Sequence, residues 1–265
     1  MDLYLIWVAF ILGIVEGATE FLPVSSTGHL IIAADLLNFS GDSSQVFEIF
    51  IQLGAILAVM IEYRKKIAHT FSGLHHSTIA QNFTLLLIIA FIPAALLGFF
   101  FHEAIKFYLF NPIAVAIALI IGGIIIILIE KFIPVRQSMT VDEINKKQAL
   151  YIGLAQCLSL IPGVSRAGAT IMGGLVAGLD RKTATEFSFF LAIPIIVAAS
   201  LFDLSQNYHL LSRADLIIFF TGFVTAFISA LLVIKLFIHF VAHHDFVIFG
   251  WYRILIGFLT LWYFF

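Results

Sequence analysis

The chain has 265 residues, of which 62% are hydrophobic and 11% charged, with a mean hydropathy of +1.08 and a formal net charge of −2. Soluble domains carry about 25% charged residues, so this composition excludes a soluble globular protein and predicts a polytopic protein of the membrane bilayer. The small negative net charge gives no indication of a nucleic-acid partner, and we expect none. The single cysteine, Cys157, excludes an intrachain disulfide.

Six apolar stretches have close to the ~20 residues that a helix needs to cross the hydrocarbon core. In chain order they are 46–63, 83–101, 112–130, 185–202, 216–238 and 246–265. The N-terminal apolar run does not resemble a signal peptide, because Asp2 stands where a basic residue is expected and the apolar run continues up to the polar motif at residues 23–29. We therefore expect the N-terminal segment to be retained.

Two further apolar regions are each interrupted by a short polar motif. The first region, 3–37, contains PVSSTGH at residues 23–29, and the second, 149–179, contains PGVSRAG at residues 162–168. The pieces that follow each motif are too short to cross a bilayer. Non-helical backbone at membrane depth is tolerated only inside protein or beside water, so we interpret both regions as re-entrant helical hairpins.

The predicted order is hairpin, three spans, hairpin, three spans, in one integral membrane domain covering residues 1–265. Each half has an odd number of spans, so the halves are predicted to be inverted-topology repeats, approximately 1–133 and 147–265. The fold class is therefore all-α, with six transmembrane helices and two hairpins. Glycines spaced four apart, Gly13 with Gly17 and Gly174 with Gly178, are expected to let helices approach closely.

Lysine and arginine are distributed unequally between the two sides of this topology, and the more basic side is expected to be cytoplasmic. One side carries only Lys106 and Arg213. The other side carries Arg64, Lys65, Lys66, Lys131, Arg136, Lys146, Lys147, Arg181, Lys182 and Lys235. We expect both termini to lie outside, with the first hairpin entering from the outer face and the second from the cytoplasm.

Each interruption places the N-terminus of a short helix at the tip of a hairpin. Free backbone N–H groups and the positive end of the helix dipole point there and favour an anion. Ser25 and Ser165 are typical N-cap residues, so capping alone competes with a role in phosphate binding. Arg166 adds a planar cation that can grip phosphate with two hydrogen bonds. The alternative to phosphate binding is an ion pair of Arg166 with Glu16 or Glu20, and that pair could also be the resting state of the site.

The first hairpin carries acidic and hydroxyl side chains. Glu16 and Glu20 are four residues apart and share a helix face, where two carboxylates could hold Mg²⁺ or Ca²⁺ together with substrate phosphates; a structural pair is the alternative. Ser26, Thr27 and His29 supply hydroxyls and an imidazole within one helical turn. A histidine can act as base, acid or nucleophile near neutral pH.

The motif EGATEFLPVSSTGH at residues 16–29 closely resembles the first signature of the bacitracin-resistance-type undecaprenyl pyrophosphate phosphatases, and PGVSRAGAT at residues 162–170 resembles the second. Chain length and motif positions fit that family throughout. The resemblance implies a phosphatase of the bacterial inner membrane that converts undecaprenyl pyrophosphate to undecaprenyl phosphate, recycling the carrier lipid for cell-wall synthesis and giving bacitracin resistance. One departure is Ala167, where many members have serine.

The resemblance and the motif chemistry together define the expected site. The catalytic residues would be Glu20, Ser26, His29 and Arg166; pyrophosphate would be bound by Ser25, Thr27, Ser165, Arg166 and Thr170; the divalent cation would be held by Glu16 and Glu20. The nucleophile is left open between Ser26, His29 and water. A Ser26 nucleophile with His29 as proton shuttle is favoured, with Glu20 as an alternative base. A monomer and a homodimer both remain open.

Two rival functions fit parts of the pattern. A transporter or lipid flippase also uses inverted repeats with broken helices and would bind the same anion without cleaving it. A membrane lipid phosphatase of the acid phosphatase superfamily would need a second histidine six residues after its arginine, where this chain has Met172. That departure counts against the second rival.

Overall fold

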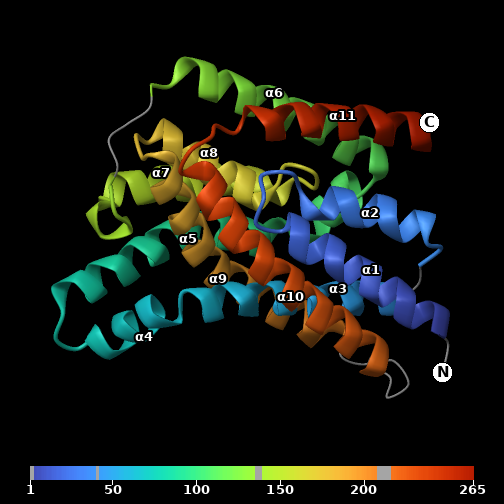
Figure 1. Cartoon of the computed structure of the whole chain (residues 1–265), viewed down its shortest axis with the longest axis horizontal. Coiled ribbons are helices and arrows are strands. Elements are labelled where there is room, and N and C mark those ends of the chain that lie inside the picture. Colours follow the sequence, from blue (N-terminus) through green and yellow to red (C-terminus); the bar gives the residue numbers. More distant parts are fainter. Residues whose placement is uncertain (1–2, 40–41, 135–138, 208–215) are drawn as a thin grey trace.

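The computed structural model describes residues 3–39, 42–134, 139–207 and 216–265, and it is built of helices without a strand in those ranges (Figure 1). The α-helices are α1 (Leu3–Thr19), α2 (Ser26–Leu36), α3 (Asp42–Glu62), α4 (Arg64–Gly73), α5 (Thr78–Leu109), α6 (Pro112–Phe132), α7 (Lys146–Gln156), α8 (Arg166–Val176), α9 (Arg181–Asn207), α10 (Leu216–Val241) and α11 (Val247–Phe264). Two short 3₁₀ helices, η1 (Val141–Glu143) and η2 (Cys157–Leu160), precede α7 and α8.

The helix lengths confirm an all-α polytopic membrane protein. Among the described residues, five helices are long and apolar enough to cross a membrane, and α3 with α4 makes a sixth if the 75° bend between them lies within one span. These helices cover the six predicted stretches except for Tyr63, Phe246 and Phe265 at their ends. The helix α5 starts earlier than predicted because Ser77 caps it, its hydroxyl accepting a hydrogen bond from the amide of Ala80.

Both interrupted regions fold as hairpins. α1 packs against α2, and α7 packs against α8. The returning helices α2 and α8 have 11 residues each, which corresponds to a length of about 16 Å against the ~30 Å of a hydrocarbon core. Neither helix is long enough to cross the bilayer, which agrees with re-entrant hairpins, and the depth of the hairpins in the membrane stays a prediction.

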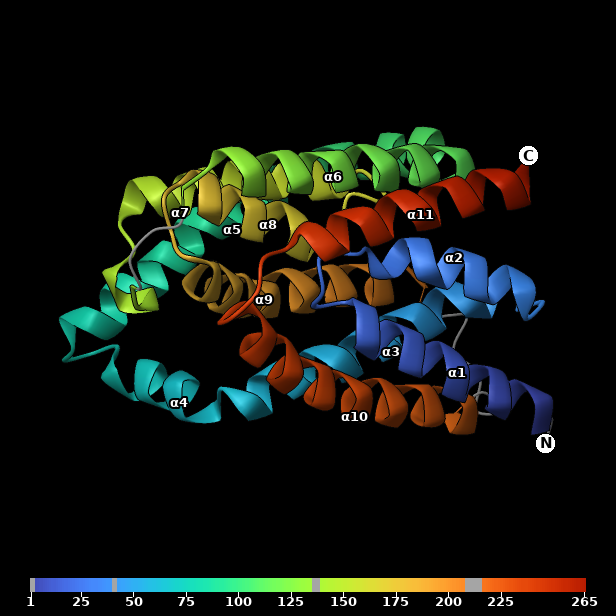
Figure 2. The same cartoon turned by 45° about the horizontal axis from the view of Figure 1, so that its top comes forward.

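The packing partners of the two halves correspond. α1 packs on α10 while α7 packs on α5, and α3 packs on α10 while α9 packs on α5. The pairs α6 with α11 and α3 with α9 join the equivalent helices of the two halves (Figure 2). Exchanging the halves therefore maps these contacts onto one another, which agrees with two related halves, and their inversion in the membrane stays a prediction. The repeat boundaries near 133 and 147 stay a prediction.

Glycines permit the closest of these contacts. A Cβ on Gly17 would lie 2.2 Å from the carbonyl oxygen of Ala226 in α10, and one on Gly13 would lie 2.5 Å from that of Gly222. Gly174 also meets α9 closely, with its Cβ 2.8 Å from that of Ala184. The expectation for Gly178 was wrong: its φ of 89° places it just after α8, where the left-handed backbone ends the helix.

Charged side chains gather at one end of the bundle and join distant elements. Lys66 pairs with Asp142 at 2.5 Å, and Lys235 pairs with Glu62 at 3.6 Å. The start of α1 and the end of α11 lie at the opposite end in Figure 2. This separation agrees with the predicted charge asymmetry. Arg136 and Arg213, which contributed to that asymmetry, lie outside the described residues.

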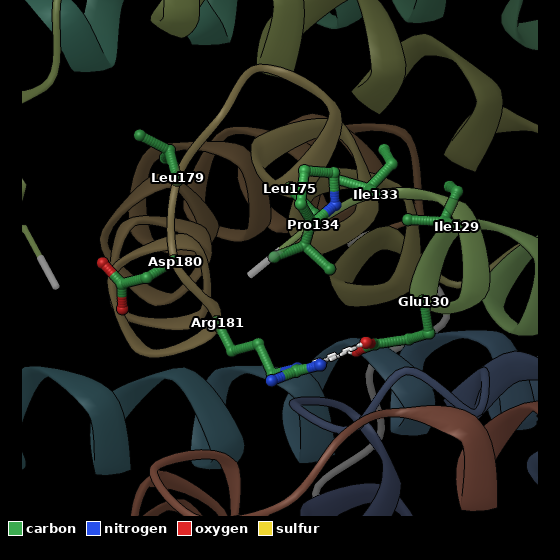
Figure 3. Close-up of a pocket in the computed structure, with 8 residues that line it drawn as sticks. All are labelled: Ile129, Glu130, Ile133, Pro134, Leu175, Leu179, Asp180 and Arg181. Carbon is green, nitrogen blue, oxygen red and sulfur yellow. Dashed lines mark hydrogen bonds and ion pairs between the residues drawn. The ribbon is translucent and has the colours of Figure 1, made fainter. Parts of the chain in front are cut away.

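The charged end also contains a bidentate ion pair, shown in Figure 3. Arg181 donates to Glu130 at 2.6 and 3.0 Å, and Glu130 accepts a further hydrogen bond of 3.0 Å from the amide of Phe246. These contacts tie α6 to α9 and to the α10–α11 connection. The cavity beside them has about 20 Å³, room for about one water, so this cavity cannot hold a lipid headgroup.

Candidate active site

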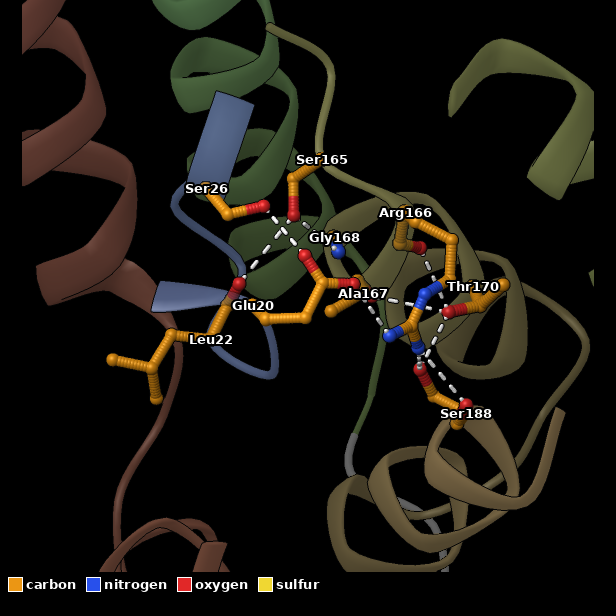
Figure 4. A network of polar contacts seen from close by, with 9 residues as sticks. All are labelled: Glu20, Leu22, Ser26, Ser165, Arg166, Ala167, Gly168, Thr170 and Ser188. Carbon is orange, nitrogen blue, oxygen red and sulfur yellow. Dashed lines mark hydrogen bonds and ion pairs between the residues drawn. The ribbon is translucent and has the colours of Figure 1, made fainter. Parts of the chain in front are cut away.

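The tips of the two hairpins meet inside the bundle. Arg166 at the start of α8 donates a hydrogen bond of 3.0 Å to Glu20, which follows α1. The hydroxyl of Ser165 lies 3.4 Å from the carbonyl oxygen of Leu22. Residues that are about 140 positions apart in the sequence therefore form one polar cluster (Figure 4).

Ser25 and Ser165 adopt the same unusual backbone conformation at the two tips. Their φ angles are 72° and 71°, a left-handed region that residues with a Cβ seldom occupy and that concentrates at functional sites. Each hydroxyl accepts a hydrogen bond from an amide three residues on, Gly28 at 3.4 Å and Gly168 at 3.0 Å. Both serines thus act as N-caps, and a direct contact of their hydroxyls with pyrophosphate stays a prediction.

Glu20 connects the first tip to the second through both of its carboxylate oxygens. Its Oε2 accepts a hydrogen bond of 2.5 Å from the hydroxyl of Ser26, and its Oε1 accepts the hydrogen bond from Nη2 of Arg166. The exposed fractions are 9% for Glu20 and 7% for Ser26. A carboxylate that accepts a hydrogen bond from a serine hydroxyl has the geometry of a base for that serine, and this role of Glu20 stays a prediction.

Arg166 is held in place by groups from α8 and α9. Its Nη1 donates to the carbonyl oxygen of Ser188 at 3.1 Å, and the guanidinium lies 5.7 Å from the ring centre of Phe21. The buried Thr170 hydroxyl lies 2.6 Å from that of Ser188 and 2.9 Å from the carbonyl oxygen of Arg166. These contacts of Thr170 position Arg166, and the predicted contact of Thr170 with pyrophosphate stays a prediction.

Two functional groups at the tips are buried and lack a partner among the described residues. They are Nε of Arg166 and the carboxylate of Glu16, whose two oxygens both lack a hydrogen bond. Glu16 has no exposed surface, and its charge interacts with those of Glu20, Glu48 and Arg166. Unpaired buried polar groups are costly, so these atoms are the natural contacts for a ligand that the chain itself does not supply.

The unpaired carboxylate of Glu16 bears on whether the site can bind a divalent cation. Glu16 offers two free carboxylate oxygens, which are the ligands that Mg²⁺ and Ca²⁺ prefer. Both oxygens of Glu20 are already engaged, and the described residues contain no cluster of three or more acidic, histidine or cysteine ligands. One carboxylate is thus available to a cation, which would have to draw its remaining ligands from a bound phosphate, and the cation stays a prediction.

His29 lies one turn after Ser26 but turns toward other partners. Its Nδ1 is 2.7 Å from the carbonyl oxygen of Ser25, and its Nε2 is 2.7 Å from the hydroxyl of Tyr252 in α11. Both ring nitrogens are thus engaged, and Ser26 is hydrogen-bonded to Glu20 instead. The hydroxyl of Thr27 has no hydrogen bond within the part of the chain that the structure describes.

A second arginine, which sequence reasoning missed, joins the tips. Arg253 in α11 is 1% exposed, and its guanidinium N–H groups point at five backbone carbonyls. The distances are 3.1 Å to Pro23, 2.8 Å to Val164, 2.9 Å to Gly163, 3.2 Å to Ala118 and 3.4 Å to Leu119. An arginine inside an apolar span is itself a functional signal, and that signal was available in the sequence.

Comparison with known proteins identifies the family to which this arrangement belongs. Residues 9–259 match the family described as bacitracin resistance protein BacA. The chain belongs to the BacA family. A protein of Methylobacillus flagellatus named undecaprenyl-diphosphatase is 53% identical over 269 aligned positions that cover all of both chains. A protein of Nitrosomonas europaea with the same name is 54% identical over 261 positions, 98% of this chain and 95% of the relative. The two BacA family signatures predicted from the sequence are those that meet at the tips.

Proposed function

We propose that this chain is an undecaprenyl-diphosphatase, which hydrolyses undecaprenyl pyrophosphate to undecaprenyl phosphate and inorganic phosphate. The observation that carries the proposal is the contact of Ser26, Glu20 and Arg166 where the N-termini of α2 and α8 meet. Relatives that share more than half of the sequence over almost its whole length bear the name of this activity.

Backbone amides of the two tips and the guanidinium of Arg166 together provide an anion site. The first N–H groups of α2 and α8 lack partners within their own helices and face the tip. Arg166 is the first residue of α8, and its Nε is buried without a hydrogen-bond partner among the described residues. A pyrophosphate group there would meet amides from both repeats and a permanent positive charge, which would stabilise negative charge as it develops during transfer.

The chemical step that fits the contacts uses Ser26 as nucleophile. Its oxygen attacks the terminal phosphorus while its proton passes to Oε2 of Glu20. The bond from oxygen to phosphorus forms as the bond from phosphorus to the bridging oxygen breaks, and undecaprenyl phosphate leaves. Water then hydrolyses the phosphoserine, which releases inorganic phosphate and restores the hydroxyl. His29 as nucleophile remains the alternative, and it requires Nε2 to leave Tyr252.

A divalent cation, Mg²⁺ or Ca²⁺, is part of the proposal. Glu16 would hold it together with phosphate oxygens, and Glu20 would be the second carboxylate if its present contacts rearranged. When bound, such an ion neutralises charge on the pyrophosphate and polarises its oxygens. The free oxygens of Glu16 support this role.

The rival function is transport of the intact lipid. The names of the relatives speak for hydrolysis rather than transport, and a serine hydroxyl hydrogen-bonded to a carboxylate has the geometry of an activated nucleophile. The test is release of inorganic phosphate from a C55 pyrophosphate lipid by the purified protein in detergent, with and without EDTA. Release that EDTA suppresses is expected. A pure, folded protein that binds the lipid without releasing phosphate would favour the transporter.

We further propose that the protein lies in the bacterial inner membrane with both termini in the periplasm and the site opening to the outer face. The gathering of basic residues at one end supports this orientation. Cysteine at Lys147, in a Cys157→Ser protein, should resist an impermeant thiol reagent added to spheroplasts. Cysteine at the exposed Phe110, on the opposite side, should react. The reverse pattern would overturn the orientation.

A further inference from the structure

Tyr252 makes a contact with the site that neither signature contains. Its hydroxyl lies 2.7 Å from Nε2 of His29, across 223 positions of sequence. The two rings are stacked, with centroids 5.6 Å apart and planes inclined by 5°. The imidazole is therefore fixed in orientation by α11, a helix of the other half of the chain.

The partners of His29 determine where its proton lies. The carbonyl oxygen of Ser25 can only accept, so Nδ1 at 2.7 Å must carry the hydrogen. In a neutral ring Nε2 is then the acceptor, and the phenol of Tyr252 is the donor that faces it. The two contacts together select one tautomer of the ring.

Arg253, the next residue in α11, fixes the position of Tyr252 relative to the two tips. Arg253 binds carbonyl oxygens of both hairpin tips, at Pro23 and Val164. This segment of α11 is thus attached to the same backbone that carries Ser25 and Ser165. Tyr252 is therefore held at a constant distance from the first tip.

We propose that Tyr252 is a positioning residue of the site, which acts through His29 by holding its Nε2 and selecting the tautomer protonated on Nδ1. This inference rests on the proposed phosphatase function and extends it. In this tautomer Nε2 is the one ring nitrogen that carries no hydrogen and keeps an in-plane lone pair, so any proton that His29 accepts in turnover enters there. Tyr252 controls the direction and the availability of that lone pair.

The test uses Tyr252→Phe, which keeps the ring stacking and removes only the hydroxyl. Tyr263→Phe is the matched control, because Tyr263 also lies on α11 and donates to a side chain of α2, Asp35, at 2.9 Å. Tyr252→Phe should lower kcat about tenfold, the effect of one lost hydrogen bond of ordinary strength, with KM within about twofold. Tyr263→Phe should leave both constants near those of the unaltered protein.

A double variant separates positioning from a general structural effect. If Tyr252 acts through His29, adding Tyr252→Phe to His29→Gln should cause no further loss of kcat. A further loss of about tenfold in the double variant would overturn the proposal, because the tyrosine would then act independently of the histidine.

A second readout does not depend on turnover. In ¹⁵N NMR of the full-length protein, with the His29 signals assigned by their absence in His29→Gln, Nδ1 should appear protonated and Nε2 as a hydrogen-bonded acceptor. In Tyr252→Phe the Nε2 signal should shift, and in Tyr263→Phe it should not. Unchanged His29 signals in Tyr252→Phe would contradict the contact. If the unaltered protein released no phosphate, the proposed function would fail while this spectrum still decided the contact.

Discussion

The hydroxyl of Ser26 donates to Glu20 across 2.5 Å, although the two residues lie on opposite sides of the helix break in the first hairpin. The turn at residues 20–25 bends the chain back so that the end of α1 faces the start of α2. The second hairpin contributes Arg166 to the other oxygen of the same carboxylate. The proposed nucleophile and base thus come from the first repeat, and the arginine proposed to bind phosphate comes from the second.

Glu20→Gln should lower kcat by at least about 100-fold, the range ascribed to a positioned acid–base or electrostatic group. The amide keeps the size of the side chain and can still bond to Ser26, but it cannot take a proton. Phosphate release under saturating lipid measures the effect. Glu62→Gln, at a partly exposed ion pair with Lys235, is the control and should remain active. Equal activity of the two variants would make Glu20 a structural residue.

Arg166→Lys should leave the protein folded and remove most of the activity, and Arg166→Ala should remove nearly all of it. Lysine keeps the charge but not the planar fork that contacts Glu20, Ser188 and a phosphate together. Binding of a pyrophosphate lipid, measured in detergent, should weaken in both variants. Arg64→Lys serves as the control at the charged end. An Arg166→Ala protein with full activity would be incompatible with the site.

The sequence predicted much of the fold because the bilayer limits what an apolar chain can do. Helices α2 and α8 are too short to cross, so the hairpins that they form with α1 and α7 could be predicted from length alone. The meeting of the two tips followed from the duplicated motif. The packing of α6 on α11 could not be predicted, since apolar helices in a bilayer present similar faces and their partners are chosen by side-chain fit.

Sequence spacing described the site less completely. Ser26 and His29 are one turn apart, which favoured a direct pair, yet the imidazole turns to Ser25 and Tyr252 and the hydroxyl turns to Glu20. The partner Tyr252 comes from a helix more than 200 positions away, beyond the reach of any local pattern. Arg253 could have been noticed as a charge in an apolar span, but its five carbonyl partners depend on the assembled tips.

Glu16→Gln should weaken the response to divalent cations as well as the rate. The buried carboxylate has both oxygens free, and an amide is a poorer ligand for Mg²⁺ or Ca²⁺. Besides activity, the measurement is the rise in thermal unfolding temperature when the cation is added, which reports binding to the folded state. The rise should be smaller in Glu16→Gln than in the unaltered protein. If Glu16→Gln and Glu20→Gln both kept the original rate and cation response, the carboxylates would be structural.

Arg253→Met should destabilise the protein, because it leaves several buried carbonyl oxygens at the tips without a donor. The expected loss in free energy of unfolding is about 3 kcal/mol or more, since each orphaned group costs about 1–3 kcal/mol. Thermal unfolding in detergent measures it. Arg166→Ala is the comparison and should lose activity with a much smaller loss of stability. A stable Arg253→Met protein would show that the tips hold together without it.

The most direct test of the account is the identity of a trapped phosphoenzyme, obtained by rapid acid quenching during turnover of a ³²P-labelled C55 pyrophosphate lipid. We predict an acid-stable adduct that disappears in Ser26→Ala, because phosphoserine survives acid and phosphohistidine does not. An acid-labile adduct that persists in Ser26→Ala and vanishes in His29→Ala would contradict the account. So would the absence of any adduct together with entry of solvent ¹⁸O into phosphate within a single turnover, which would mean direct attack by water.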